Sequence, residues 1–235
     1  MLVTQEFTVK VDGNIILDDL HLDFGPGIHV VMGPNGVGKS TFAHALMGNP
    51  KYQTEGAVQI DGKDLLCLET HERAQAGLFL SFQHPTPIEG LSNFQFLRQA
   101  IKTSSISNSL STYRELLSKF NLPEGFERKS LNVEASGGEQ KKNEIIQMLM
   151  LDPKVAILDE PDSGLDVDAI NVLSEQLTNF ANQQNKTLIV ITHYQQLIEK
   201  LSPESITIFK NKRAKQFDDI SIAYEILENG FGIDV

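Results

Sequence analysis

The residues with the clearest chemistry form a glycine-rich segment near the N-terminus. It reads Gly33, Pro34, Asn35, Gly36, Val37, Gly38, Lys39, Ser40, Thr41 and matches the phosphate-binding pattern G-x-x-x-x-G-K-[ST] at every defining position. In such a loop, glycines let successive amide groups point at phosphate oxygens, and the following helix adds its positive N-terminal end. We therefore expect Lys39 to reach the β- and γ-phosphates of a nucleotide and the Ser40 hydroxyl to ligate Mg2+.

The segments on either side of this loop have the pattern that the motif requires. Residues 27–32 are an apolar, β-branched run suited to a buried strand, and Phe42, Ala45 and Leu46 follow at helical spacing until Gly48. The sequence thus predicts a strand, a loop and a helix in that order. A glycine-rich turn without function is the alternative, and the Lys-Ser pair between strand and helix argues against it.

Two carboxylates follow a second apolar run. Residues 155–158 are Val-Ala-Ile-Leu, and Asp159 and Glu160 come directly after them. Because ligands bind at the carboxyl ends of strands in open α/β sheets, Asp159 is expected to hold Mg2+ through water, and Glu160 to orient or deprotonate an attacking water. Taken alone, a strand with an acidic turn explains these residues equally well. The phosphate-binding segment upstream favours a role of the two carboxylates in nucleotide chemistry.

A second group of small residues opens another predicted helix. Ser136, Gly137, Gly138 and Glu139 precede a helical pattern over 139–151, which stops at Asp152-Pro153. A helix N-terminus of this kind can again bind an anion. Since one γ-phosphate does not need two such sites from one chain, we expect this one to serve a nucleotide held by another subunit.

Composition limits the possible partners. The chain has 235 residues, a formal net charge of -11 and one cysteine, Cys67. The acidity disfavours nucleic acid as a partner, because neutralising phosphates needs clustered Lys and Arg. A single cysteine allows no internal disulfide and no iron-sulphur cluster held by this chain alone. No apolar run reaches the ~20 residues of a membrane span, so we expect no direct membrane insertion and a cytoplasmic location.

The predicted elements fall into two patterns. Short β-rich runs separated by turns indicate an antiparallel layer near the N-terminus. Alternating strands and helices after residue 155 indicate a parallel sheet, and a helical stretch is inserted before it. The expected strands are 2–11, 15–22, 27–32, 57–60, 78–82, 155–158, 187–192 and 206–209; the expected helices lie within 92–126 and at 139–151, 168–183 and 194–201; and 104–111 is expected to be a loop. The predicted fold class is α/β.

In these motifs the chain resembles the nucleotide-binding domain of ABC ATPases over essentially its full length. Residues 33–41 correspond to Walker A, Gln83 to the Q-loop glutamine, 136–139 to the signature, 159–160 to Walker B, 163–166 to the D-loop and His193 to the switch histidine. The resemblance implies a P-loop NTPase with a parallel core sheet, an antiparallel β subdomain and an inserted helical subdomain.

The same resemblance implies the remaining site assignments. The chain would be one ABC ATPase domain over 1–235, with a catalytic core at about 1–84 and 152–235 and a helical signature subdomain at about 85–151. ATP and Mg2+ would be the cofactors. The catalytic residues would be Lys39, Gln83, Glu160 and His193, and the metal would be held by Ser40, Gln83 and Asp159. Two subunits would sandwich ATP between Walker A of one and the signature of the other.

Within this family, three stretches resemble SufC-type ATPases of iron-sulphur cluster assembly: 82–94, 137–145 and 159–169. That implies SufB/SufD-like scaffold proteins as partners and a transient, ATP-dependent homodimer that remodels them. The chain departs from the usual pattern at Ala135, Gln140 and Pro161, and Val11 stands where many ABC ATPases stack an aromatic ring on adenine.

Three other functions are considered for a chain with these motifs. The chain could be the ATPase subunit of a membrane ABC transporter, whose coupling helices would use the same groove; residues 85–93 are expected to discriminate this from the Suf function. A soluble regulator or DNA-repair ATPase is disfavoured by the acidity of the chain. A binding module without catalysis is disfavoured because Lys39, Asp159, Glu160 and His193 are all present.

Overall fold

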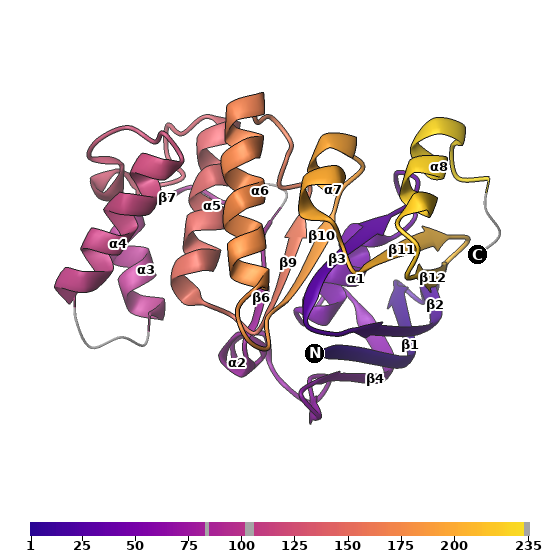
Figure 1. Cartoon of the computed structure of the whole chain (residues 1–235). Coiled ribbons are helices and arrows are strands. Elements are labelled where there is room, and N and C mark those ends of the chain that lie inside the picture. Colours follow the sequence, from indigo (N-terminus) through magenta and orange to yellow (C-terminus); the bar gives the residue numbers. More distant parts are fainter. Residues whose placement is uncertain (83–84, 102–105, 233–235) are drawn as a thin grey trace.

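Two large sheets, a two-stranded sheet of β7 and β8 and a set of covering helices make up the described part of the molecule (Figure 1). The computed structural model describes residues 1–82, 85–101 and 106–232. An antiparallel sheet has the order β2-β1-β4-β5, and a second sheet has the order β12-β11-β3-β10-β9-β6. The strands are β1 (Leu2–Val11), β2 (Asn14–Phe24), β3 (Gly27–Met32), β4 (Gln53–Ile60), β5 (Lys63–Asp64), β6 (Leu78–Leu80), β9 (Val155–Asp159), β10 (Thr187–Ile191), β11 (Ser205–Lys210) and β12 (Arg213–Phe217).

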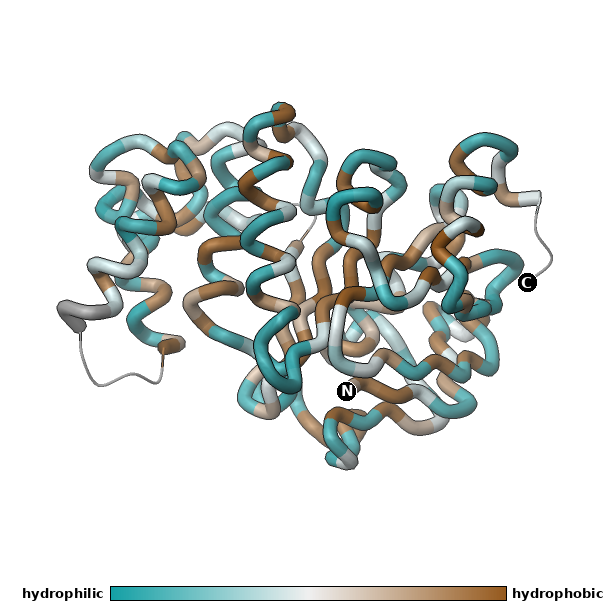
Figure 2. The backbone as a smooth tube through the Cα atoms, viewed as in Figure 1, coloured by the Kyte–Doolittle hydropathy of each residue, from teal (hydrophilic) through white to brown (hydrophobic). Residues whose placement is uncertain are grey.

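The second sheet is parallel except at one edge. Strands β11, β3, β10, β9 and β6 pair in parallel, while β12 runs antiparallel to β11. Strands β9 and β10 are buried along their whole length, as expected when helices or another layer cover both faces. Figure 2 shows these strands mostly in the hydrophobic colour. This central sheet brings the carboxyl ends of β3, β10 and β9 side by side.

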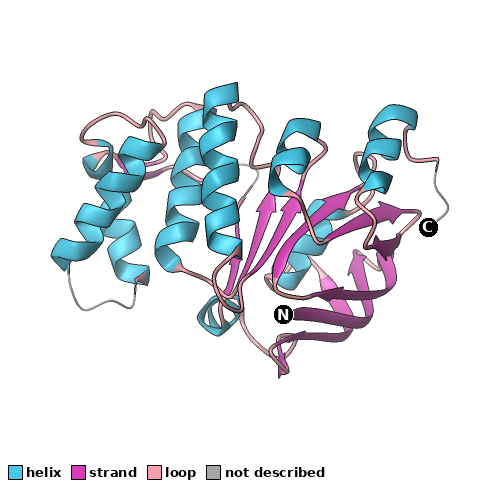
Figure 3. Cartoon of the chain, viewed as in Figure 1, coloured by secondary structure: helices cyan, strands magenta, loops and turns pink. Residues whose placement is uncertain are grey.

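Helix α1 (Lys39–Leu46) lies between the two sheets. Its buried residues Phe42 and Leu46 belong to one apolar cluster with Phe7 and Phe24 of the antiparallel sheet and Ile157 of the central sheet. Figure 3 shows the antiparallel sheet below the central one, with α1 between them. The loop that precedes α1 is therefore fixed by packing on two sides.

The other face of the central sheet is covered by four helices: α5 (Gly137–Leu151), α6 (Val167–Ala181), α7 (Gln195–Leu201) and α8 (Ser221–Asn229). Along β9, Val155 and Ile157 face the cluster of α1, whereas Ala156 and Leu158 face the cluster of α5, α6 and α7. This alternation follows from the two-residue period of a strand. Helix α8 packs on Val30 and Ile208 of β3 and β11.

A helical region extends from one end of the sheet. It contains β7 (Ile88–Ser92), α3 (Asn93–Ala100), α4 (Ile106–Lys119), η1 (Phe126–Arg128) and β8 (Ser130–Leu131). The loop expected at 104–111 is wrong for residues 106–111, which belong to α4, and residues 104 and 105 lie outside the described residues. The serines in this stretch indicate a break, but Tyr113 and Leu117 of α4, and Phe120 directly after it, are buried and stabilise the helix against its neighbours.

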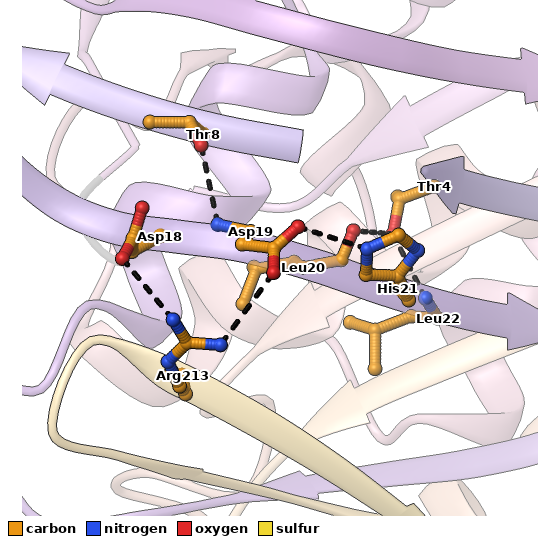
Figure 4. A network of polar contacts seen from close by, with 8 residues as sticks. All are labelled: Thr4, Thr8, Asp18, Asp19, Leu20, His21, Leu22 and Arg213. Carbon is orange, nitrogen blue, oxygen red and sulfur yellow. Dashed lines mark hydrogen bonds and ion pairs between the residues drawn. The ribbon is translucent and has the colours of Figure 1, made fainter. Parts of the chain in front are cut away.

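A polar seam joins the two sheets at their outer edge. The Arg213 guanidinium of β12 lies 3.5 Å from carboxylates of both Asp18 and Asp19 on β2 (Figure 4). The Asp18 N–H also donates to the Lys212 carbonyl at 2.7 Å. The Asp19 N–H donates to the Thr8 hydroxyl of β1 at 3.1 Å. These side chains are exposed, so each ion pair contributes at most about 1 kcal/mol. The seam orients the sheets more than it stabilises them.

The predicted fold class is confirmed, and the differences lie in particular elements. Strand β4 begins at Gln53, four residues before the predicted start. Strand β12 and helices α2 (Thr70–Ala76) and α8 were not predicted. None of the helices in the described part of the chain is both long and apolar enough to cross a membrane.

Candidate functional site

The predicted phosphate-binding loop connects the end of β3 to the start of α1. Gly36 and Gly38 have φ values of 76° and 112°, in the region that favours glycine. A Cβ on Gly38 would lie 2.7 Å from Cδ2 of Leu17, so a larger residue would also collide with β2. Gly38 is the N-cap of α1 and provides no side-chain cap, which leaves the first amide groups of the helix to bind an anion.

The Lys39 ammonium lies over this loop. It donates to the carbonyl oxygens of Gly33 at 2.7 Å and Pro34 at 3.1 Å. Burial lowers the pKa of Lys39, and the negative charges of Glu160 and Asp159 oppose that shift. The lysine at the start of α1 thus lies within the electrostatic influence of the two carboxylates at and after the end of β9.

Asp159 and Ser40 lie close together. Asp159 is the last residue of β9 and is 3 % exposed. Burial raises the pKa of Asp159, while the nearby Ser40 hydroxyl lowers it. The Asp159 N–H donates to the Ser81 hydroxyl at 3.1 Å, which fixes the end of the strand.

This pair fits Mg2+. The ion is usually bound by one or two carboxylates together with substrate phosphates and waters. A hydroxyl close to a buried carboxylate provides such donors. Among the described residues no group of three or more His, Cys, Asp or Glu side chains is placed to hold a metal ion. Phosphates of a bound nucleotide and waters would complete the coordination.

Glu160 and His193 lie at the ends of adjacent strands. Glu160 follows β9 with a φ of 49°, and its N–H donates to the Ile191 carbonyl of β10 at 2.9 Å. His193 follows β10 two residues later and is exposed. Between them, the Thr192 hydroxyl donates to Asp162 at 2.7 Å and accepts from the Tyr194 N–H at 3.0 Å, joining the loops after the two strands. The chemical roles assigned to Glu160 and His193 stay predictions.

The second glycine-rich segment caps α5, which begins at Gly137 rather than at the predicted Glu139. The Ser136 hydroxyl accepts from the Glu139 N–H at 3.3 Å, and the Glu139 carboxylate accepts from the Ser136 N–H at 2.8 Å and its hydroxyl at 2.9 Å. These bonds lower the pKa of Glu139. A Cβ on Gly138 would lie 3.1 Å from the Gly164 carbonyl, so this turn packs against the loop before α6.

The two glycine-rich segments open helices on opposite faces of the central sheet (Figure 1). The prediction that Ser136 to Glu139 serve a nucleotide of another subunit stays a prediction. Gln83, predicted both at the metal and in catalysis, lies outside the described residues, and Phe82 is the last described residue before it.

Sequence reasoning missed three polar side chains around these strand ends: Ser81, Lys141 and Glu144. Lys141 and Glu144 belong to α5 and are buried, and burial raises the pKa of Glu144 to about 7. A signal was present, since positions 141, 144, 145 and 148 have the spacing of one helix face, and Ile145 and Met148 mark that face as buried.

Comparisons with known proteins agree with this geometry. The family model described as "ABC transporter" matches residues 17–163. "Vegetative protein 296" of Bacillus subtilis is 39% identical over 239 residues, covering 98% of this chain and 91% of that protein. "Probable ATP-dependent transporter SufC" of Escherichia coli is 37% identical over 249 residues, covering 99% and 98%. A dimeric ATP-binding cassette in a post-hydrolysis state, bound to ADP and Pi, has a similar fold, with a TM-score of 0.78, 22% identity and coverage of 93% and 98%.

Proposed function

The chain belongs to the ABC ATPase family, and from this premise we propose that it is the ATP-hydrolysing subunit of a Suf-type iron-sulphur cluster assembly complex. The observation that carries the ATPase part is that the Lys39 ammonium lies over the loop before α1, where it donates to the Gly33 and Pro34 carbonyls, while the charges of Asp159 and Glu160 act on it and Ser40 lies close to Asp159. The loop before α1 would bind the phosphates of ATP, with Lys39 at the β- and γ-phosphates. Mg2+, bound by Ser40 and Asp159 with Gln83, would neutralise the charge of the phosphates.

The reaction itself needs a positioned water. We propose that Glu160 orients this water and takes its proton, and that His193 donates a hydrogen bond to the γ-phosphate. Both residues follow neighbouring strands, β9 and β10, whose register is fixed by parallel pairing. The products would be ADP and phosphate. Residues 136–139 would complete the site of a second copy of the chain, so that ATP binding closes a dimer and hydrolysis reopens it.

The Suf assignment rests on the relatives and on the chain's own composition. A relative named SufC is 37% identical over nearly the whole chain. With one cysteine, the chain cannot ligate a cluster by itself. We therefore propose that cluster chemistry belongs to SufB/SufD-like scaffold proteins in the cytoplasm, and that the helical signature subdomain, about 85–151, transmits ATP-driven motion to them.

The alternative is the ATPase subunit of a membrane ABC transporter. The Escherichia coli relative and a 40% identical relative from Cyanophora paradoxa are each named "Probable ATP-dependent transporter". A tagged full-length chain recovered from its native cell without detergent decides between the two. A soluble partner that carries a cluster supports the Suf function, whereas recovery only with a polytopic protein from solubilised membranes supports the transporter function.

The ATPase function is tested by two variants. We expect Lys39→Ala to abolish nucleotide binding, and Glu160→Gln to bind ATP but hydrolyse it at least about 100-fold more slowly, because the water loses its base. Phosphate release and size-exclusion chromatography with Mg-ATP measure both effects, and Glu160→Gln should accumulate as a dimer. Equal hydrolysis by wild type and Glu160→Gln would remove Glu160 from the proposed role.

A further inference from the structure

Helix α5 does more than present residues 136–139. We propose that Glu144 and Lys141 are positioning residues for ATP hydrolysis, because together they hold the backbone of Phe82 against the end of β9, where Asp159 lies. The inference rests on the proposed ATPase function, since it concerns the same site.

Glu144 accepts a hydrogen bond from the backbone. The Phe82 N–H donates to Glu144 Oε1 at 3.0 Å, and the residue is 5 % exposed. Its other oxygen, Oε2, is buried and has no hydrogen-bond partner in the described part of the chain. A carboxyl group so deeply buried and half satisfied destabilises the fold relative to an apolar residue. Its use as the acceptor for one particular amide points to a role beyond packing.

Lys141 holds the other polar group of the same residue. Its ammonium donates to the Phe82 carbonyl at 3.0 Å and to the Asp159 carbonyl at 3.3 Å. One buried cation thus joins the segment after β6 to the end of β9, where the predicted metal ligand lies. Both backbone groups of Phe82 are therefore held by side chains one helical turn apart on α5.

Among the described residues, few contacts other than those of this pair hold Phe82. The sheet pairing ends just before it, since Ser81 donates its N–H to Ile157 at 2.9 Å and β6 itself stops at Leu80. The Phe82 side chain is 48 % exposed and contacts the His44 ring at a centroid distance of 5.9 Å. In place of a neighbouring strand, α5 supplies the hydrogen bonds that set this part of the backbone.

The same helix is tied to the helical region by neutral groups. Asn143 accepts from the Tyr113 hydroxyl at 2.8 Å and donates to the Asn93 side chain at 2.9 Å. Residues 141–144 thus connect α3 and α4 on one side with the strand ends on the other. If the helical region shifted, α5 would transmit the movement to Phe82.

Four variants of the full-length chain separate positioning from packing. Glu144→Leu removes the acceptor at similar size, while Glu144→Gln keeps an oxygen for the Phe82 N–H. Lys141→Met removes the other contact. Tyr113→Phe is the matched control, because it deletes a buried hydrogen bond to the same helix without touching Phe82. The measurements are kcat and KM for Mg-ATP, hydrogen exchange of the Phe82 amide, and stability in urea.

We expect Glu144→Leu and Lys141→Met to lower kcat about 10-fold or more with a smaller change in KM, because misplacing the end of β9, with Asp159 and Glu160, affects chemistry more than binding. Glu144→Gln should restore kcat to within about twofold, and Tyr113→Phe should change it by no more than that despite a loss of stability. The Phe82 amide should exchange about 10-fold faster in Glu144→Leu than in Glu144→Gln.

Two results would overturn the positioning role. One is a kcat that falls equally in Glu144→Leu and Tyr113→Phe, which would make the effect a matter of stability alone. The other is a Phe82 amide that exchanges at the same rate in wild type and Glu144→Leu. Failure of the proposed function gives a different result, namely no Mg-ATP hydrolysis by the wild type itself. If Glu144→Leu does not fold, Lys141→Met and its conservative partner Lys141→Arg apply the same test.

Discussion

Helices α1 and α5 each begin after a glycine-rich segment, yet they are held in the molecule by different forces. The buried face of α1 consists of Phe42, Ala43, Ala45 and Leu46, packed between two sheets. The buried face of α5 includes Lys141, Asn143, Glu144 and Gln147 beside its apolar residues. One helix is fixed by apolar contact and the other in large part by hydrogen bonds.

The difference has a physical consequence. Apolar contacts are strong and non-directional, so they fix α1 firmly at the depth that the phosphate-binding loop requires. Hydrogen bonds are directional, so the polar face of α5 can hold several backbone segments in register at once. Their individual contributions are smaller, which allows the contacts to be exchanged when a helix moves. Thus α1 suits a fixed phosphate site, and α5 suits a connection between regions.

The largest loss of stability is expected from a change in α1, the helix that is fixed by apolar contacts. Phe42 is fully buried and contacts the rings of Phe24 and Phe209, with centroids 6.4 and 5.3 Å away. Phe42→Ala should lower the free energy of unfolding by about 3–5 kcal/mol, because it opens a cavity between the sheets. Urea denaturation measures this loss. Phe217→Ala, at a half-buried edge position, is the control and should lose much less; similar losses would contradict the contrast.

The apolar part of the fold is also the part that could be predicted. Strands β3, β9 and β10 are continuous apolar runs, and the helix after residues 33–41 has a regular apolar spacing, so both were found close to their observed bounds. Strand β12, Arg-Ala-Lys-Gln-Phe, is an edge strand with too few apolar residues to indicate one. The strand predicted at 57–60 is shorter than β4, because Gly56 interrupts the β-rich pattern. In the structure Gly56 has a φ of 92° and lies beside a bulge in β1.

Helix α2 was not predicted because, like α5, it is held in part by a buried polar side chain. Its buried residue is Arg73, whose guanidinium donates to the carbonyls of Ala45 at 3.1 Å and Leu46 at 2.7 Å at the end of α1. Sequence patterns of apolar spacing cannot show such a contact, because the partners are backbone atoms of another element. Lys141 and Glu144 were missed for the same reason, since their partners are backbone groups of Phe82.

The stability contributed by α5 should depend on pH, because its buried face contains Glu144. Burial raises the pKa of Glu144 to about 7 from an ordinary value of 4.5, so the folded state binds more protons than the unfolded state between these values. Stability contributed by the protonated form is therefore lost as pH rises from about 4.5 to 7. Glu144→Gln should gain about 2–3 kcal/mol relative to wild type between pH 5 and pH 8, measured by urea denaturation. A difference that stays constant with pH would show that the carboxyl group is not buried as described.

A smaller loss of stability is expected when the hydrogen bonds of Asn143 to α3 and α4 are removed. Tyr113→Phe removes the hydroxyl that Asn143 accepts, and Asn143→Leu leaves both Tyr113 and Asn93 without that partner. We expect losses of about 1 kcal/mol for Tyr113→Phe and about 1–3 kcal/mol for Asn143→Leu. The double variant should lose less than the sum, because both changes remove the same hydrogen bond. Strict additivity in a double-mutant cycle would mean that the buried pair is not coupled.

The smallest expected effect tests the starts of the two helices. Ser136 caps α5 with its hydroxyl, whereas Gly38 begins α1 without a side-chain cap. Ser136→Ala should therefore lower the free energy of unfolding by about 1 kcal/mol. If residues 136–139 also bind the nucleotide of a second copy, the same variant should weaken ATP-dependent dimerisation of Glu160→Gln beyond this loss. Asp166→Ala, which removes the side-chain cap of α6, is the stability control, and sedimentation with and without Mg-ATP measures the dimer. Equal weakening by both variants would assign Ser136 to the helix alone, and its cap would then be structural like that of α6.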